Sequence, residues 1–153
     1  MATLLPPASG SAEGAQMDYV LINALAIAAA TLAGLGTGAI VYLLLDRPGA
    51  TMRTVSRARI VKLLTLAFLA QFWLATILTG ALILAPAEAN ASVMALSSAL
   101  VIWIGFVAPV IVTTHYYREM PFRTTLIDCG HWLAVMLVQA SVLYAIGLTP
   151  PPV

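Results

Sequence analysis

Long uninterrupted runs of apolar residues alternate along the chain with short polar segments. The four apolar runs cover approximately residues 19–45, 60–85, 93–114 and 124–148. Each run exceeds the roughly 20 residues that a helix needs to cross a hydrocarbon core of about 30 Å. The pattern therefore predicts an all-α membrane protein whose four transmembrane helices pack as an antiparallel bundle.

The segments between and beyond these runs contain residues that end helices. Asp46-Arg47-Pro48-Gly49 follows the first run, Pro86 begins the second loop, and Pro121 lies within the third, which runs from His115 to Arg123. Residues 1–17 contain Pro, Gly and Ser without apolar periodicity and predict a flexible N-terminal tail. Residues 149–153 predict a Pro-rich C-terminal tail. We therefore expect one transmembrane domain over residues 18–148 and no separate soluble domain.

The composition excludes a water-soluble globular protein. Hydrophobic residues make up 61% of the 153 positions and charged residues only 8%, whereas soluble domains carry about 25% charged residues. The formal net charge of +1 is also too small for a nucleic-acid partner, which requires clustered Lys and Arg. The expected surroundings of the chain are therefore the lipid bilayer.

The basic residues are distributed unevenly among the loops. All seven lie in or beside the first and third loops, and the second loop and both tails have none. Short loops rich in Lys and Arg stay on the cytoplasmic side of a membrane. The sequence therefore predicts a multi-pass protein of the bacterial inner (cytoplasmic) membrane with both termini in the periplasm. Basic loops should also attract anionic lipids.

A few polar residues lie inside the apolar runs. Asp128 and His131 are three residues apart and share one face of the fourth run. Ionisable groups at membrane depth are candidates for proton, ion or ligand handling. Asp128 is, however, only about 7–8 Å from the interfacial Arg123, which favours a structural polar cluster. Gln71 and Gln139 lie deeper, where amides usually form hydrogen bonds between helices.

The third run contains a proline within its helical pattern. Pro109 lacks an amide hydrogen, so the helix should kink there and free the carbonyl of Gly105. Because Pro109 and His131 are expected at similar depths, we predict that the third helix packs on the fourth and that His131 or water satisfies this carbonyl. Gly105 and Pro109 thereby join Gln71, Asp128 and His131 as the candidate functional cluster.

The first run carries small residues at intervals of four. Ala30, Gly34 and Gly38 form one stripe, which lets a second helix backbone approach closely. We interpret the stripe as a helix-packing face, and contact within the chain is favoured over contact between separate chains.

A family resemblance lies mainly in the C-terminal half. The motifs Trp103-x-Gly105-Phe106-x-x-Pro109 and Leu126-Ile127-Asp128-x-Gly130-His131 resemble a bacterial membrane-protein family known only as domain of unknown function 1761. Its members are similar in length and have four predicted spans. In the N-terminal half, the chain keeps only Gly38 and Tyr42 of the family pattern, and its first loop is rich in arginine. The resemblance implies no activity.

No motif indicates catalysis or a cofactor. Zinc-ligand spacings, phosphate-binding Gly loops and hydrolase signatures are absent from the sequence. His115 and His131 are expected at different depths, which disfavours a haem ligand pair. We therefore expect no enzyme, no cofactor and no metal. The favoured function is an accessory or structural subunit of a membrane complex, or a self-associating scaffold, whose partners are other membrane-protein subunits or further copies of the chain. The alternative is a small oligomeric transporter or channel with an Asp128/His131 polar site.

Overall fold

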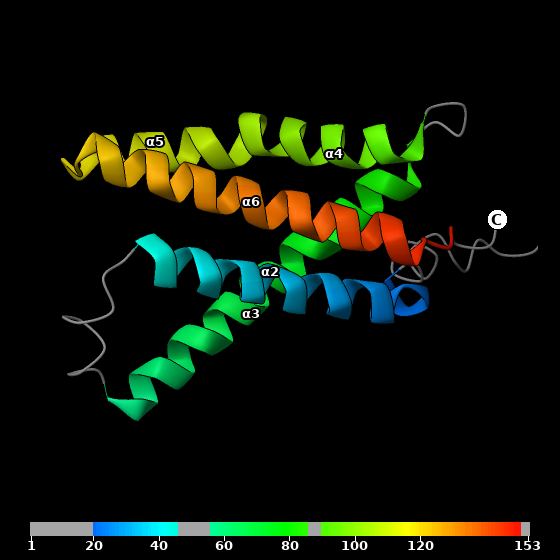
Figure 1. Cartoon of the computed structure of the whole chain (residues 1–153), viewed down its shortest axis with the longest axis horizontal. Helices are drawn as coiled ribbons and strands as arrows, with labels where there is room; N and C mark the ends of the chain where they lie inside the picture. Colours follow the sequence, from blue (N-terminus) through cyan, green and yellow to red (C-terminus); the bar gives the residue numbers. More distant parts are fainter. Residues whose placement is uncertain (1–19, 46–55, 86–89, 151–153) are drawn as a thin grey trace, which may run out of the picture.

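The computed structural model describes residues 20–45, 56–85 and 90–150, and these residues are predominantly helical (Figure 1). The helices in chain order are α2 (Ala24–Leu45), α3 (Arg57–Ile83), α4 (Ala91–Ile102), the π-helical turn η2 (Trp103–Val107), α5 (Ala108–Tyr117) and α6 (Phe122–Ile146).

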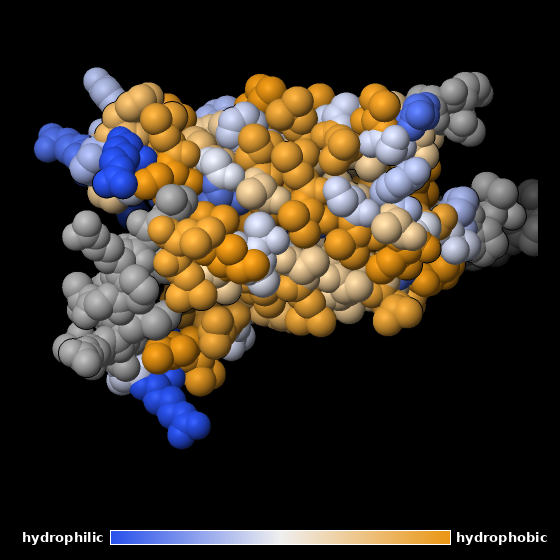
Figure 2. Space-filling model, in the orientation of Figure 1, coloured by the Kyte–Doolittle hydropathy of each residue, from blue (hydrophilic) through white to orange (hydrophobic). Residues whose placement is uncertain are grey.

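Within these residues, four helical segments are long and apolar enough to cross a membrane. They are Ala24–Val41, Arg57–Ile83, Ala91–Tyr117 and Phe122–Ile146. The third consists of α4, η2 and α5. This result confirms the prediction of an all-helical membrane protein with four spans. Figure 2 shows the apolar surface that the helices present along their length.

Side-chain caps extend the second and third spans beyond the apolar runs. α3 begins three residues before its predicted start because the hydroxyl of Ser56 accepts a hydrogen bond from the Arg59 amide at 3.4 Å. α4 begins two residues early because Oδ1 of Asn90 accepts bonds from the amides of Ser92 and Val93 at 3.1 and 3.4 Å. Capping of this kind satisfies amides that have no partner inside the helix.

A proline and a glycine mark the two ends of α6. Pro121 immediately precedes the helix, and Gly147 ends it with a φ of +82°, a value that glycine adopts without steric cost.

The predicted flexible tail at residues 1–17 lies outside the described residues, as do residues 151–153 of the predicted C-terminal tail. Thr149 is described, and it joins the segment after α6 to the segment before α2. Its amide donates to Oδ1 of Asn23 at 2.9 Å, and its carbonyl accepts from Nδ2 of Asn23 at 2.9 Å.

The irregularity of the third span begins before Pro109. Residues Trp103–Val107 form one π-helical turn, in which the amide of Ala108 donates to the carbonyl of Trp103, five residues earlier. Pro109 then falls in the first turn of α5, where a helix needs no amide donor. The wider turn therefore accommodates the proline ring, and α4 and α5 continue in nearly the same direction (Figure 1).

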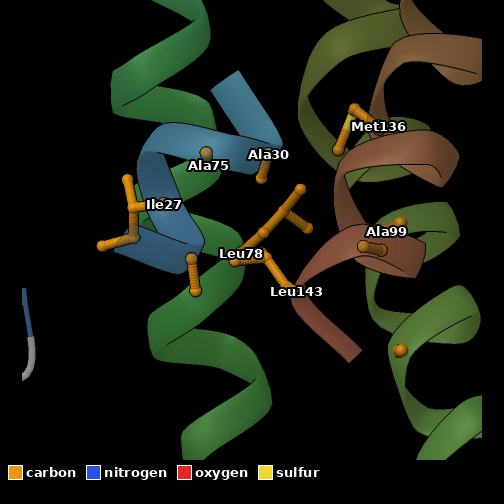
Figure 3. Close-up of a cluster of buried hydrophobic side chains, with 10 residues drawn as sticks. Ile27, Ala30, Ala75, Leu78, Ala99, Met136 and Leu143 are labelled. Atoms are coloured by element: carbon orange, nitrogen blue, oxygen red, sulfur yellow. The ribbon is translucent and has the colours of Figure 1, made fainter. Parts of the chain in front are cut away.

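α6 contacts every other helix in the described part of the chain. α4 and α5 run along one side of α6, α2 lies on the other side, and α3 crosses α2 obliquely (Figure 1). Fully buried residues hold these helices together at the end of the molecule where α3 ends and α4 begins (Figure 3). They include Ile27, Ala30, Ala75, Leu78, Ala99, Met136 and Leu143.

At the opposite end of the molecule, packing is looser along α3 and around Asp128. Along α3, Leu78 is 0% exposed and Gln71 is 4% exposed, yet Leu64 on the same helical face is 59% exposed. On α6, Val135 is 0% exposed, but the side chain of Asp128, two turns earlier on the same face, is 44% exposed. We call this end, where α3 and α6 begin, the open end.

Candidate functional site

The polar side chains inside the spans form two separate groups. One is a pair of buried amides where α2, α3 and α6 meet. The other is a histidine–carboxylate contact at the open end, between α5 and α6. The candidate residues predicted from the sequence do not form a single cluster: Gln71 lies in the amide pair, Asp128 lies at the open end, and the other three belong to neither contact.

Gln139 and Gln71 form the interhelical hydrogen bond predicted for amides at this depth. Nε2 of Gln139 donates to Oε1 of Gln71 at 2.8 Å and to the carbonyl oxygen of Gln71 at 3.1 Å. Gln139 is 0% exposed, and its own Oε1 has no hydrogen-bond partner among the described residues. The two donated bonds tie α6 to α3 near the middle of the bundle.

Gly34 allows α2 to reach this amide pair. A Cβ atom at position 34 would lie 2.6 Å from Oε1 of Gln71 and 2.8 Å from Nε2 of Gln139, which is closer than carbon can approach either atom. The other members of the small-residue stripe also face neighbouring helices. Ala30 is fully buried, and a Cβ atom at position 38 would lie 3.2 Å from Cε1 of His131. The stripe therefore packs inside the chain.

At the open end, Asp128 has a partner that the sequence analysis did not assign to it. Nε2 of His115 lies 3.4 Å from Oδ2 of Asp128, and Nδ1 of the same ring lies 3.2 Å from the hydroxyl oxygen of Thr125. Thr125 is buried and the side chain of His115 is only 15% exposed. The hydroxyl and the carboxylate together hold the imidazole between α5 and α6.

His115 and Thr125 were missed as site residues, although a signal was present. The connector between the third and fourth spans is short and contains Pro121. Two helices joined in this way fold back on each other, so residues at similar distances from the connector meet. Chemically, the arrangement places a ring nitrogen beside a carboxylate, and the exposed part of Asp128 can meet a cation or water.

A double-mutant cycle tests this contact against the pairing suggested by sequence spacing. We expect a coupling energy of about 1 kcal/mol between His115→Ala and Asp128→Ala, because each change removes the same contact. The matched cycle with His131→Ala should give a coupling of less than about 0.5 kcal/mol, because His131 faces Gly38 of α2. Unfolding of the purified chain in mixed micelles measures both cycles. A larger coupling to His131 would contradict the geometry.

The third helix packs on the fourth as expected, but the prediction that Gly105, Pro109 and His131 meet at this contact is wrong. Gly105 and Pro109 are exposed on the surface of the third span, and the ring of His131 faces α2. The contact between the third and fourth spans uses Trp103, whose indole Nε1 donates to the carbonyl oxygen of Cys129 at 2.9 Å. The physical reason is the orientation of the third span, which turns Gly105 and Pro109 outward and Trp103 toward α6.

The chain matches a known protein family along most of its length. A family model described as "Protein of unknown function (DUF1761)" matches residues 25–144. The chain belongs to this family. The match covers most of the DUF1761 chain, so the expectation that the resemblance lies mainly in the C-terminal half is wrong. It includes Gly34 and Gln71 of the amide pair as well as the residues of the open end. No curated protein and no solved structure matches the chain.

In the described part of the DUF1761 chain, no group of three or more His, Cys, Asp or Glu side chains is arranged to hold a metal ion. Cys129, the single cysteine, is buried on α6 and its backbone carbonyl serves the indole of Trp103. The site of this DUF1761 protein thus consists of two interhelical polar contacts, one sealed and one partly accessible.

Proposed function

We propose that this protein is a non-enzymatic subunit or self-associating scaffold of the bacterial inner membrane. In this proposal the four spans form an antiparallel bundle with both termini in the periplasm. Its partners are other membrane-protein subunits or further copies of the chain.

One observation carries the proposal: the deep polar groups bind other helices of the same chain. Gln71 and Gln139 bind each other, and Gly34 lies directly against them. Large apolar side chains instead face outward on α2, α3 and α5. A chain built in this way presents its surface to lipid and to other apolar helices, which suits a structural role.

The distribution of charge supports the proposed orientation. In the described residues, the basic side chains lie at the beginning of α3 and around the connector between α5 and α6. They are Arg57, Arg59, Lys62, Arg118 and Arg123. These positions belong to the first and third loops, which the positive-inside rule assigns to the cytoplasm. The open end would then face the cytoplasmic leaflet.

Affinity purification from native membranes tests the role as a subunit or scaffold. The full chain, tagged at one terminus and extracted in mild detergent, is expected to elute as a complex larger than the monomer. Mass spectrometry identifies whether the complex contains other proteins or only further copies. Tyr117→Ala is a suitable control for the extraction, because this exposed residue lies at the end of α5. A monomer that co-purifies with no protein would reject the proposal.

The alternative function is a small oligomeric transporter or channel. It is favoured by the partial exposure of Asp128 on a helical face that is otherwise buried. His131 lies three residues further along the same helix. Flux of protons or common cations into liposomes that Asp128→Asn reduces and Glu119→Gln leaves unchanged would support this alternative. Flux equal to that of empty liposomes would exclude it for those ions.

A further inference from the structure

The π-helical turn leaves one backbone carbonyl of the third span without an amide donor. In an α-helix the carbonyl of Ile104 would accept from the amide of Ala108, four residues later. Here the amide of Ala108 donates to the carbonyl of Trp103 instead. The next residue, five positions after Ile104, is Pro109, which has no amide hydrogen to donate. The carbonyl of Ile104 is therefore unpaired within its own helix, and no side chain among the described residues donates to it.

This carbonyl lies in the middle of the third span and on its outer surface. The span comprises Ala91–Tyr117, so Ile104 is about 20 Å from each end. Helical hydrogen bonds run nearly parallel to the axis, and a carbonyl therefore lies on the same face as its own side chain. Ile104 is 56% exposed, and nothing lies within 4 Å of a Cβ atom at the neighbouring Gly105. Because hydrocarbon contains no water to pair with this carbonyl, it requires a donor from another protein chain.

A donor without a partner is exposed on α3. Trp73 is 64% exposed, and its indole N–H has no hydrogen-bond partner among the described residues. Tryptophan in membrane proteins is enriched at the two interfaces, where its N–H reaches water. Trp73 instead lies about 15 Å along the helix from Ile83, the last residue of α3. Its N–H is therefore surrounded by hydrocarbon and requires an acceptor.

This donor and this acceptor lie at similar depths. α3 ends and α4 begins at the same end of the molecule (Figure 1), so both distances are counted from that end. Ile104 is about 20 Å from it and Trp73 about 15 Å. Helical side chains lean toward the N-terminus of their helix, which moves the indole of Trp73 toward the depth of Ile104. Copies of one chain share one orientation in the membrane, so the indole of one copy can meet the carbonyl of another.

Other exposed side-chain donors in the spans are already used or lie near a membrane surface. The hydroxyls of Thr65 and Ser141 donate to carbonyls of their own helices at 2.9 and 2.7 Å. Further exposed hydroxyls lie in the last two turns of their spans, among them Thr113 and Tyr144. The basic side chains lie at the beginning of α3 and around the connector between α5 and α6. Among the described residues, Trp73 is therefore the exposed donor that suits this depth.

We propose that the face of the third span at Ile104 and Gly105 is a binding surface for a second copy of this chain, in which the indole N–H of Trp73 donates to the carbonyl of Ile104. Gly105 lets the partner helix approach the carbonyl closely, because it carries no side chain. This inference rests on the proposed self-association and names the contact that carries it.

Energy transfer between labelled copies tests this contact. Full-length chains with donor or acceptor fluorophores on a C-terminal tag are reconstituted in liposomes of phosphatidylethanolamine and phosphatidylglycerol, and dilution with lipid gives the dissociation constant. Trp73→Phe keeps an aromatic ring and removes the donor, so the constant should rise about threefold to tenfold, the effect of one interhelical hydrogen bond. Trp132→Phe is the matched control, because this tryptophan is half-buried on α6 against His131. It should leave the constant unchanged.

Pro109→Ala tests the carbonyl itself. The substitution restores an amide to the third span, which allows the helix to pair the carbonyl of Ile104 internally. Self-association should weaken by a similar factor, although the monomer keeps its helix content by circular dichroism. The double variant with Trp73→Phe should be no weaker than the weaker single variant, because both changes remove the same bond. Losses that multiply in the double variant would show that the two residues act separately and would overturn the inference.

The remaining outcomes separate this inference from the proposed function. Energy transfer that both single variants leave unchanged would place self-association on another surface, overturning the inference and leaving the scaffold role intact. A complex with a different protein but no energy transfer between copies would also overturn it and would favour the role as a subunit. A monomer with neither kind of partner would overturn both proposals.

Discussion

Replacing Leu78 with alanine is expected to lower the free energy of unfolding by about 2–5 kcal/mol. Leu78 is 0% exposed and packs in the cluster that joins α2, α3 and α6 (Figure 3). Its truncation removes dispersion contacts and leaves a cavity that neighbouring helices fill only in part. Unfolding in mixed micelles with increasing sodium dodecyl sulfate, followed by circular dichroism, measures the change.

The matched control for this prediction is Leu66→Ala on the same helix. Leu66 is 66% exposed, so the same substitution should change the free energy of unfolding by less than about 0.5 kcal/mol. Equal losses in the two variants would show that Leu78 does not lie in a packed core and would contradict the arrangement of α3.

Replacing Gly34 with leucine is expected to destabilise the bundle by about 1–3 kcal/mol or more. Even a single added carbon would lie 2.6 Å from Oε1 of Gln71. The amide cannot move aside freely, because it accepts the hydrogen bond from Gln139 and both residues are buried. The variant must therefore either break the amide pair or push α2 away from α3 and α6. Gly34→Ala should show a smaller loss of the same origin.

Gly36 on the same helix supplies the control for this second prediction. Nothing lies within 4 Å of a Cβ atom at position 36, and the residue is exposed. Gly36→Leu should therefore leave stability unchanged or raise it slightly, because leucine favours helix more than glycine does. Thermal unfolding of the two leucine variants in one detergent compares them directly. Greater damage from Gly36→Leu would contradict the packing of α2.

The polar residues show how far sequence reasoning reaches in this protein. The depth of Gln71 and Gln139 along their helices follows from counting residues, and an amide at that depth needs a partner. A hydrogen bond to another helix was therefore predicted for each amide, whereas only the structure shows that the two bind each other. The contact between Asp128 and His115 was not, because spacing on one helix points to His131 and says nothing about the ring that a neighbouring helix presents.

Pro109 illustrates a second limit. Its lack of an amide hydrogen predicts a kink in the third helix; the structure instead has a π-helical turn just before Pro109, and α4 and α5 continue in nearly the same direction (Figure 1). A backbone has more than one way to accommodate a proline, and here a π-helical turn at Trp103–Val107 immediately precedes α5. The choice depends on how tightly α4 and α5 can pack along α6, which is a property of the assembled helices.

The sequence by itself determined that this is a membrane protein of four spans, because hydrophobic length and the scarcity of charge are local properties that each segment carries alone. Caps such as Asn90 shifted helix ends by only a few residues. Only the tertiary structure decided which faces meet: Gly34 against the amide pair, His115 against Asp128, and α3 leaving the bundle at Leu64. In a chain that is apolar on nearly all sides of its helices, periodicity does not distinguish a protein-facing side from a lipid-facing side. Close packing of particular side chains makes that distinction.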